Sequence, residues 1–428
     1  MKFHWFHLMP WPHLPDDFQQ KHRSVWVDVD YRLYDPERGN AVYHEYLDEL
    51  EFAEKCGFDG ICVNEHHSNA YGLMPSPNLM AAALARRTER AAIVVMGNSI
   101  ALYNPPLRVA EEFAMLDVLS GGRLVAGFPV GTSMDTNFAY GANPAQLRER
   151  YYEAHDLILQ CWTRKDTFHF NGKYTQVRYV NPWPRPLQQP HPPIWIPGGG
   201  SIETWEWCAD RGYLYSYLSY SGYKRAQKVM QGFWERMERM GKETNPYHAG
   251  FAQVVCVAET EREAKELYWP HIDYFYNRCL HVYPGFADAP GYRTLRTVKA
   301  GLRSQFEQAA QNARARQSWE GLVEQGYVIA GSPSRVAEQL DELAETLHVG
   351  HLMLLMQMGD MPREKAYYNT ALFAEKVMPL LRDKFKEYED HWYPKPLPRE
   401  RRARPQPLPE PSEVLRQPAR ARRKEERE

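Results

Sequence analysis

The sequence predicts an α/β fold of the (β/α)8 type, a TIM barrel with insertions. Short apolar segments with the composition of buried strands alternate about eight times with segments of helical periodicity along the 428-residue chain. This alternation indicates a parallel sheet, and eight units joined by right-handed crossovers close into a barrel. Hydrophobic residues make up 43% of the chain and charged residues 25%, so we expect a large core. An open doubly wound sheet is the alternative for the same alternation.

The first half of the chain supplies four of the expected strands. They lie at residues 2–8, 59–64, 92–99 and 123–128. The helices between them are expected at residues 41–56, near 78–88, and after Asn104-Pro105-Pro106. Gly57 and the pair Gly121-Gly122 are placed to end the first and third of these helices, because glycine suits a C-terminal cap.

The second half continues the alternation and adds a hairpin. A helix near 146–163 precedes two short segments joined by Asn171-Gly172, a sequence typical of a hairpin turn. The next strand is expected at 193–196, and strand–helix pairs follow at 213–241 and from 251 onward. The last pair is a strand at 351–356 and a helix with apolar residues at Tyr367, Ala371, Ala374, Met378 and Leu381.

Two segments depart from the barrel, which we expect to span residues 1–392. Residues 266–328 form a long aromatic-rich insertion, expected to act as a lid over the active site or as an oligomer contact. Residues 393–428 form a Pro/Arg-rich tail, whose part from residue 395 holds 11 Lys and Arg, 6 Asp and Glu, and seven prolines. This composition predicts disorder, with an arginine-rich docking segment as the alternative.

The composition also bears on partners and compartment. The formal net charge is 52 − 54 = −2, which gives no reason to expect a nucleic-acid partner. The sequence has no apolar run near the roughly 20 residues that span a bilayer, and its N-terminus lacks the apolar core of a signal peptide. The six cysteines form no Cys-x-x-Cys pair, which argues against disulfides and a cysteine-built zinc site. We therefore expect a cytoplasmic protein without a membrane partner.

Glu65-His66-His67 directly follows the second expected strand. Reactive groups of (β/α)8 barrels lie at the carboxyl ends of strands, so these residues are catalytic candidates. Neighbouring side chains alternate in direction, so the two histidines are poorly placed to bind one metal ion, and we expect no metal site. The alternative is a hydrogen-bonded trio with a structural role.

A second candidate site is the glycine run Gly198-Gly199-Gly200 with Ser201, between the fifth strand and a helix. Glycines let backbone N–H groups approach an anion, and a helix N-terminus favours negative charge. Ser201 and Thr204 add hydroxyl donors, which predicts a phosphate cradle; the run matches neither the Walker loop nor the GxGxxG fingerprint. A tight turn alone would also require glycine.

A third candidate is the pair Gly97-Asn98 at the end of the third strand. Gly97 permits unusual backbone geometry, and the Asn98 amide is suited to the polar edge of a heterocycle. A simple turn at the strand end is the alternative.

In their order along the chain, these motifs resemble the bacterial-luciferase-like family of flavin-dependent monooxygenases, over roughly residues 1–390. Asn64-Glu65-His66-His67 matches the family's Glu-His-His signature, and the segment from Pro106 to Arg123 resembles its third helix and fourth strand. The pattern from Ser201 to Gly212 follows its phosphate-binding helix, and Gly331 to Val336 is similar to the start of its final helix.

The resemblance implies a function and roles for these residues. It implies that reduced FMN arrives from a separate NAD(P)H:flavin reductase and binds with its phosphate near Gly199, Gly200, Ser201 and Thr204. O2 is the co-substrate, and a flavin hydroperoxide oxygenates a small organic molecule. His66 corresponds to the family's catalytic histidine, and Glu65 is expected to fix its tautomer. Gly97-Asn98 corresponds to a non-proline cis peptide that supports the flavin, and a homodimer is expected.

The chain also departs from the family pattern. Val130 stands where luciferases carry an arginine that helps hold the flavin phosphate, and Gly200 replaces the acidic residue before the serine. Part of the phosphate contact must therefore differ. The alternatives are a deazaflavin-dependent hydride-transfer oxidoreductase, whose relatives tend to carry Asp-His after the second strand, and a non-catalytic flavin-binding protein. A metal-dependent barrel hydrolase is a weaker alternative.

The sequence indicates only the general character of the substrate. Aromatic residues in the insertion and near the end of the first strand favour an apolar or aromatic organic molecule, although the same residues suit the core of a lid. They are Trp269, Tyr274, Phe275 and Tyr276, and Trp5, Phe6 and Trp11.

Overall fold

The computed structural model describes residues 1–131, 133–218, 222–287, 289–299, 318–403 and 405–412. Residues Met1–Pro396 form one compact unit, and residues Leu397–Glu428 are a second unit. In the second unit, η6 (Arg399–Arg401) is a single 3₁₀ turn. The expectation of disorder for the tail falls largely on residues 413–428, which lie outside the described residues.

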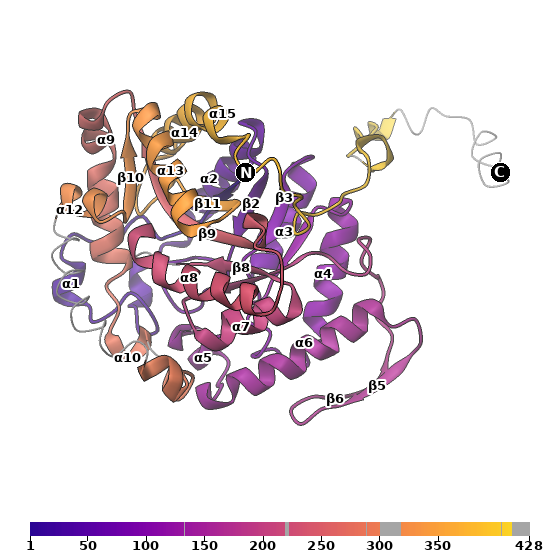
Figure 1. Cartoon of the computed structure of the whole chain (residues 1–428). Helices are drawn as coiled ribbons and strands as arrows, with labels where there is room; N and C mark the ends of the chain where they lie inside the picture. The colour runs from indigo at the N-terminus through magenta and orange to yellow at the C-terminus, as the bar shows by residue number, and fades with distance from the viewer. Residues whose placement is uncertain (132, 219–221, 288, 300–317, 404, 413–428) are drawn as a thin grey trace. The chain divides into compact units, whose positions relative to one another are not determined.

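The first unit is a closed barrel of eight parallel strands (Figure 1). Each strand pairs in parallel with the next, and the last pairs with the first, so the ring is closed. The strands in ring order are β1 (Lys2–Phe6), β2 (Gly60–Val63), β3 (Ala92–Val95), β4 (Leu124–Gly127), β7 (Ile194–Gly198), β8 (Leu214–Tyr217), β9 (Ala249–Val257) and β11 (His351–Leu355). The predicted (β/α)8 fold is confirmed, and the open sheet is excluded.

Helices connect the strands around the outside of the barrel, as the apolar periodicity predicts. They are α2 (Pro36–Lys55), α3 (Pro77–Arg87), α4 (Leu107–Ser120), α6 (Leu147–Thr163), α7 (Ile202–Arg211), α8 (Tyr223–Arg239), α13 (Pro333–Leu347) and α14 (Arg363–Leu372). The last helix continues through the π-helical η5 (Phe373–Val377) into α15 (Met378–Leu381). Gly121 ends α4 with a φ of 69°, the left-handed conformation expected of a glycine cap.

Several short elements extend the connections. The predicted hairpin is present as β5 (Phe168–Asn171) and β6 (Gln176–Val180). The connection from β1 to α2 carries α1 (Phe18–Lys21) and η1 (Tyr31–Leu33). Two short helices, α5 (Met134–Ala139) and η2 (Pro144–Gln146), follow β4, and η3 (Pro246–His248) precedes β9.

The segment expected as an irregular insertion contains more regular structure than predicted. It begins within α9 (Glu261–Tyr274), which continues as the π-helical η4 (Phe275–Cys279) even though Pro270 lies inside the helix. It then includes α10 (Pro284–Ala287) and α12 (Trp319–Glu324). A short additional strand, β10 (Val328–Gly331), pairs with the end of β9. The sequence analysis did not assign β10, because it begins at the last residue of the segment that was interpreted as an insertion.

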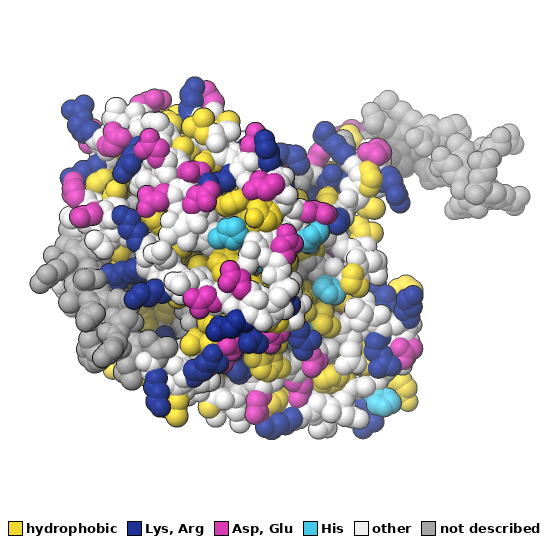
Figure 2. Space-filling view, in the orientation of Figure 1, with side chains coloured by type: hydrophobic (Ala, Val, Ile, Leu, Met, Phe, Trp, Pro, Cys, Tyr) yellow, Lys and Arg dark blue, Asp and Glu magenta, His cyan; other side chains and the backbone are white. Residues whose placement is uncertain are grey.

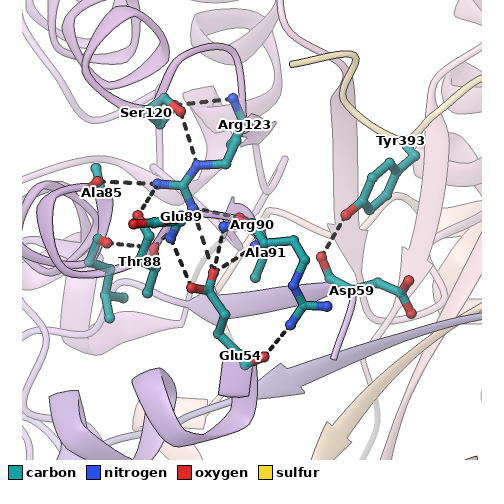
Figure 3. Close-up of polar contacts among 11 residues, drawn as sticks. Glu54, Asp59, Ala85, Thr88, Glu89, Arg90, Ala91, Ser120, Arg123 and Tyr393 are labelled. Atoms are coloured by element: carbon teal, nitrogen blue, oxygen red, sulfur yellow. Dashed lines mark hydrogen bonds and ion pairs between the residues drawn. The ribbon is translucent and has the colours of Figure 1, made fainter. Parts of the chain in front are cut away.

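A buried arginine connects the elements at the amino ends of β3 and β4 (Figure 3). Arg123 is only 2% exposed. Its guanidinium donates to the Thr88 hydroxyl and to the backbone carbonyls of Ala85, Thr88, Ala91 and Ser120. Beside it, the Glu54 carboxylate accepts backbone N–H groups of Glu89, Arg90 and Ala91. The arginine therefore satisfies carbonyls at the end of α3 and the end of α4 simultaneously.

Residues 393–396, which we expected in the tail, belong to the barrel unit. The Tyr393 hydroxyl donates to the carbonyl of Asp59 at 2.6 Å, and the Lys395 N–H donates to Gln188 at 3.2 Å. Just before them, the Trp392 indole donates to the carbonyl of Gly212. The proline-rich composition does not indicate these contacts, because two of them are made by the single side chains of Trp392 and Tyr393.

The visible surface carries mixed charge. Figure 2 shows acidic and basic side chains interspersed over this face, in line with the formal net charge of −2. Among the described helices, none has the length and apolar character needed to cross a membrane.

Candidate active site

The three residues Glu65, His66 and His67 follow the last residue of β2, at the carboxyl end of the barrel. Glu65 is buried, whereas the side chains of His66 and His67 are 19% and 13% exposed. The backbone N–H of His66 donates to the backbone carbonyl of Met74, and this hydrogen bond holds the loop in place. The histidines therefore retain access to solvent above a buried carboxylate.

His66 is oriented by Asp135, the second residue of α5. The distance from His66 Nδ1 to Asp135 Oδ2 is 3.2 Å. Burial raises the pKa of Asp135, but the hydrogen bond and charge of His66 and the hydrogen bond from Ser133 outweigh it and lower the pKa to about 2. An ionised carboxylate only accepts hydrogen bonds, so His66 Nδ1 carries the proton. His66 Nε2 is then the nitrogen left for a reacting group.

Glu65 is paired with His67 and not with His66. His67 Nε2 lies 2.8 Å from Glu65 Oε1, and the same oxygen accepts from the Tyr103 hydroxyl at 3.2 Å. Glu65 Oε2 accepts the backbone N–H of Ser99 at 2.9 Å. Orientation of His66, which we expected from Glu65, is thus provided by Asp135. The sequence contained one indication of this role: Asp135 is a carboxylate that follows the fourth strand, and barrels carry reactive groups at the carboxyl ends of their strands.

Aromatic rings surround the two histidines. His66 lies edge-to-face with Tyr71, with ring centroids 4.7 Å apart, and Trp26 lies 6.3 Å away. His67 contacts Tyr140 in the same manner at 5.1 Å. Of the aromatic residues that suggested either an apolar substrate or the core of a lid, Trp5, Phe6, Trp11, Tyr274, Phe275 and Tyr276 are all buried.

Gly97 and Asn98 lie below this centre. A Cβ at Gly97 would be 2.0 Å from the carbonyl oxygen of Gly127, so glycine is required for the close approach of β3 and β4. Asn98 is fully buried; it accepts from Asn78 at 2.8 Å and donates to Glu65 at 3.4 Å. Within the described residues the cis peptide bonds all precede proline, so the cis bond implied for Gly97-Asn98 is absent.

The glycine run at the end of β7 forms an open turn at the start of α7. A Cβ at Gly199 would meet no atom within 4 Å, and Gly200 has a φ of +89°. Ser201 is the N-cap residue of α7, and Thr204 lies in its first turn, 2% exposed. The structure therefore brings the four predicted phosphate residues together at a helix N-terminus.

Arg148 supplies a cation beside this turn. It comes from the first turn of α6, and its Nη2 donates to Ser201 Oγ at 3.3 Å. Its Nε and Nη1 are buried and have no hydrogen-bond partner among the described residues. These unsatisfied donors fit an anionic group. The sequence analysis did not identify Arg148, because this residue lies on α6, far before the glycine run, among several other charged residues.

Within the part of the chain that the structure describes, no group of three or more His, Cys, Asp or Glu side chains is arranged to hold a metal ion. The six cysteines are free thiols.

The fold and the site define a class: a (β/α)8 barrel with a histidine–carboxylate centre and an anion cradle at the carboxyl ends of its strands. Residues 24–349 match the sequence profile of the family described as luciferase-like monooxygenase. The chain belongs to this family.

Two of the similar proteins are named as monooxygenases, one of them as flavin-dependent. The oxygenase component of flavin-dependent trigonelline monooxygenase from Acinetobacter baylyi is 31% identical over 178 residues, 40% of this chain and 48% of the relative. Limonene 1,2-monooxygenase from Rhodococcus erythropolis is 23% identical over 351 residues, 79% of this chain and 82% of the relative. The chain thus spans most of the second relative and about half of the first.

Solved structures confirm the fold. The oxygenating constituent of 3,6-diketocamphane monooxygenase from Pseudomonas putida, in complex with FMN, superposes with a TM-score of 0.66 at 19% identity, over 89% of this chain and 98% of that one. An F420-dependent secondary alcohol dehydrogenase superposes with a TM-score of 0.61 at 16% identity, over 89% and 99%.

Proposed function

We propose that this protein is the oxygenase component of a two-component flavin-dependent monooxygenase. In this proposal it takes reduced FMN from a separate NAD(P)H:flavin reductase and uses O2 to oxygenate a small apolar organic molecule. The supporting observation is the pair of His66 and buried Asp135 at the mouth of the barrel, 3.2 Å apart. The relative named as an oxygenase component supports the need for a reductase.

The phosphate of FMN fits the cradle formed by Gly199, Gly200, Ser201, Thr204 and Arg148. Backbone N–H groups at the start of α7 and the Arg148 guanidinium would bind it. When bound, the reduced flavin supplies the electrons that activate O2. Gly97 and Asn98 support the site by holding Glu65 and the ends of β3 and β4 in place.

His66 is the proposed general acid and base. With Nδ1 bonded to Asp135, its Nε2 is free to accept a proton and return it to a reacting oxygen. The ionised Asp135 stabilises the imidazolium that forms when Nε2 is protonated. Glu65 holds His67 beside this centre.

The surroundings of His66 favour a substrate with an apolar body and an oxygen atom. Tyr71 and Trp26 present aromatic surface to the histidine, which suits an apolar molecule and limits the access of water. The indole N–H of Trp26 is buried without a partner among the described residues. It is therefore a donor available to a substrate oxygen.

A homodimer is part of the proposal. The outer face of α4 carries three apolar side chains one turn apart: Met115, Val118 and Leu119 are 57%, 47% and 53% exposed. An apolar helix face of this kind suits the self-complementary contact of a symmetric dimer.

The alternative cofactor is a deazaflavin, because an F420-dependent dehydrogenase has the same fold. An anaerobic titration followed by tryptophan fluorescence separates the alternatives. We expect reduced FMN to bind more tightly than reduced F420, and the opposite order would favour hydride transfer. A non-catalytic binder would bind FMN in the oxidised and reduced states alike.

The same titration tests the cradle. Arg148→Met should weaken the binding of FMN at least about tenfold, because a hydrogen bond to a charged group contributes about 1.5–3 kcal/mol. Arg178→Met, at an exposed position on β6, is the matched control and should leave binding unchanged. Equal affinity of both variants would remove Arg148 from the phosphate site.

A further inference from the structure

Residues 289–299, here called the strap, are attached to the first two turns of α7. The hydroxyls of Thr294 and Thr297 donate to the two oxygens of Glu203, at 2.5 and 2.8 Å. Arg296 pairs with Glu206 one turn further along the helix at 2.8 Å. Just before the strap, α10 contacts α5, the helix that carries Asp135 (Figure 1). The strap therefore lies next to the phosphate cradle.

Tyr292 of the strap reaches into the Arg148 and Thr204 side of the cradle. A Cβ at Gly131 would be 2.2 Å from the Cζ atom of Tyr292, so the ring takes the space that this glycine leaves open. The Arg148 guanidinium lies 5.0 Å from the centre of the ring, and the Tyr292 hydroxyl interacts with the side chains of Thr204 and Arg148. Gly291, with a φ of +81°, provides the turn that directs Tyr292 inward.

The strap also engages a second donor of the cradle. Ser201 Oγ donates to Glu203 at 3.0 Å, the same carboxylate that accepts from the two strap threonines. Burial raises the pKa of Glu203, but the hydrogen bonds from Thr294, Thr297 and Ser201 lower it to about 2, so the carboxylate is ionised at neutral pH. Ser201 and Thr204 are thus engaged, while two N–H groups of Arg148 have no partner among the described residues.

A phosphate group would bind these donors more strongly than Tyr292 does. A phenol is neutral and offers one oxygen, whereas a phosphate is anionic and offers three. A phosphate bound in the proposed cradle would need the space of the Tyr292 hydroxyl, because Tyr292 already contacts Arg148 and Thr204. Binding of the phosphate therefore requires that Tyr292 leave.

We propose that Tyr292 is a specificity-determining residue of the cofactor site, which occupies the phosphate position in the free protein and is displaced only by a ligand that carries a phosphate. This inference rests on the proposed function. A closed strap lowers the apparent affinity for the phosphate ligand by the fraction of molecules in which the strap is open. A flavin without a phosphate has no group that competes with Tyr292.

The test is an anaerobic titration of reduced FMN and reduced riboflavin into wild type and three variants. Tyr292→Ala removes the ring from the cradle, and the double variant Thr294→Val/Thr297→Val releases the strap without substituting a cradle residue. Leu295→Ala, on the same segment and 77% exposed, is the control. We expect the Kd for FMN to fall about fivefold in the first two variants, while the Kd for riboflavin changes by less than about twofold.

Different failures have different meanings. An unchanged or increased Kd for FMN in Tyr292→Ala would overturn the inference and leave the proposed function in place. An equal gain for riboflavin would also overturn it, because the effect would then not depend on the phosphate. If neither wild type nor any variant bound FMN, the phosphate cradle and the proposed function would both fall.

Discussion

At the scale of single residues, the orientation of His66 follows from the charge on Asp135. Asp135 accepts hydrogen bonds from Asn69 at 3.0 Å and from Ser133 as well as from His66, and it is fully buried. These contacts keep the carboxylate ionised and fix one tautomer of the histidine. Asp135 does not reach the reacting group itself, so its effect is on the position and charge of His66.

Asp135→Asn is the substitution that tests this role. The amide keeps the shape of the side chain but removes the charge that stabilises a protonated His66. An amide can also donate as well as accept a hydrogen bond, so it no longer fixes one tautomer of His66. We expect FMN affinity to remain within about twofold of wild type, while any rate that depends on proton transfer by His66 falls about 100-fold. Single-turnover kinetics over a range of pH would measure the loss. Asp166→Asn, exposed in the segment between α6 and β5, is the control; equal rates in both variants would contradict the role.

At the scale of elements, the sequence predicts local structure better than contacts between distant segments. Residues 107–120 show clear helical periodicity and a glycine cap, and α4 has these bounds. Glu65, His66 and Ser201 could be predicted as candidate site residues because each lies within three residues of the end of a strand. Asp135 and Arg148 could not be assigned roles, because they reach the site from α5 and α6 and only the closed barrel brings them to it.

A substitution of Arg123 tests how the amino ends of β3 and β4 are held together. Arg123→Ala removes the donors that Arg123 supplies to four backbone carbonyls (Figure 3). We expect the free energy of unfolding to fall by about 3 kcal/mol, the cost of several unsatisfied polar groups. Urea denaturation measures the change. Arg178→Ala should alter stability by less than about 0.5 kcal/mol, and a similarly small effect at Arg123 would refute its structural role.

At the scale of the whole molecule, buried histidines make the barrel sensitive to acid. Burial lowers the pKa of His7 to about 3 and of His248 to about 4, and it lowers that of His4 well below its usual value. In the unfolded chain these groups bind protons near pH 6.5, so below that pH the unfolded state binds more protons than the folded state. Their contribution to stability is therefore full above pH 6.5 and is lost as the pH falls toward 4.

Urea denaturation between pH 7.5 and 4.5 tests this account of acid sensitivity. For each histidine that is held neutral, the free energy of unfolding should decrease by about 1.4 kcal/mol for every unit that the pH falls below 6.5. His248→Gln removes one titrating group, and we expect a shallower slope for that variant. A free energy that stayed constant from pH 7.5 to 5.5 would show that these histidines are not held neutral.

The most direct test of the central claim is the rate at which O2 oxidises reduced FMN bound to the protein. Reduced FMN and protein are mixed anaerobically, then combined rapidly with oxygenated buffer and followed by flavin absorbance. We expect wild type to reoxidise more slowly than free FMN through a distinct phase, because the site limits water and His66 controls proton transfer. His66→Ala should bind FMN but lose that phase. Reoxidation of the wild-type complex at the rate of free FMN, identical to His66→Ala, would contradict the assignment as an oxygenase.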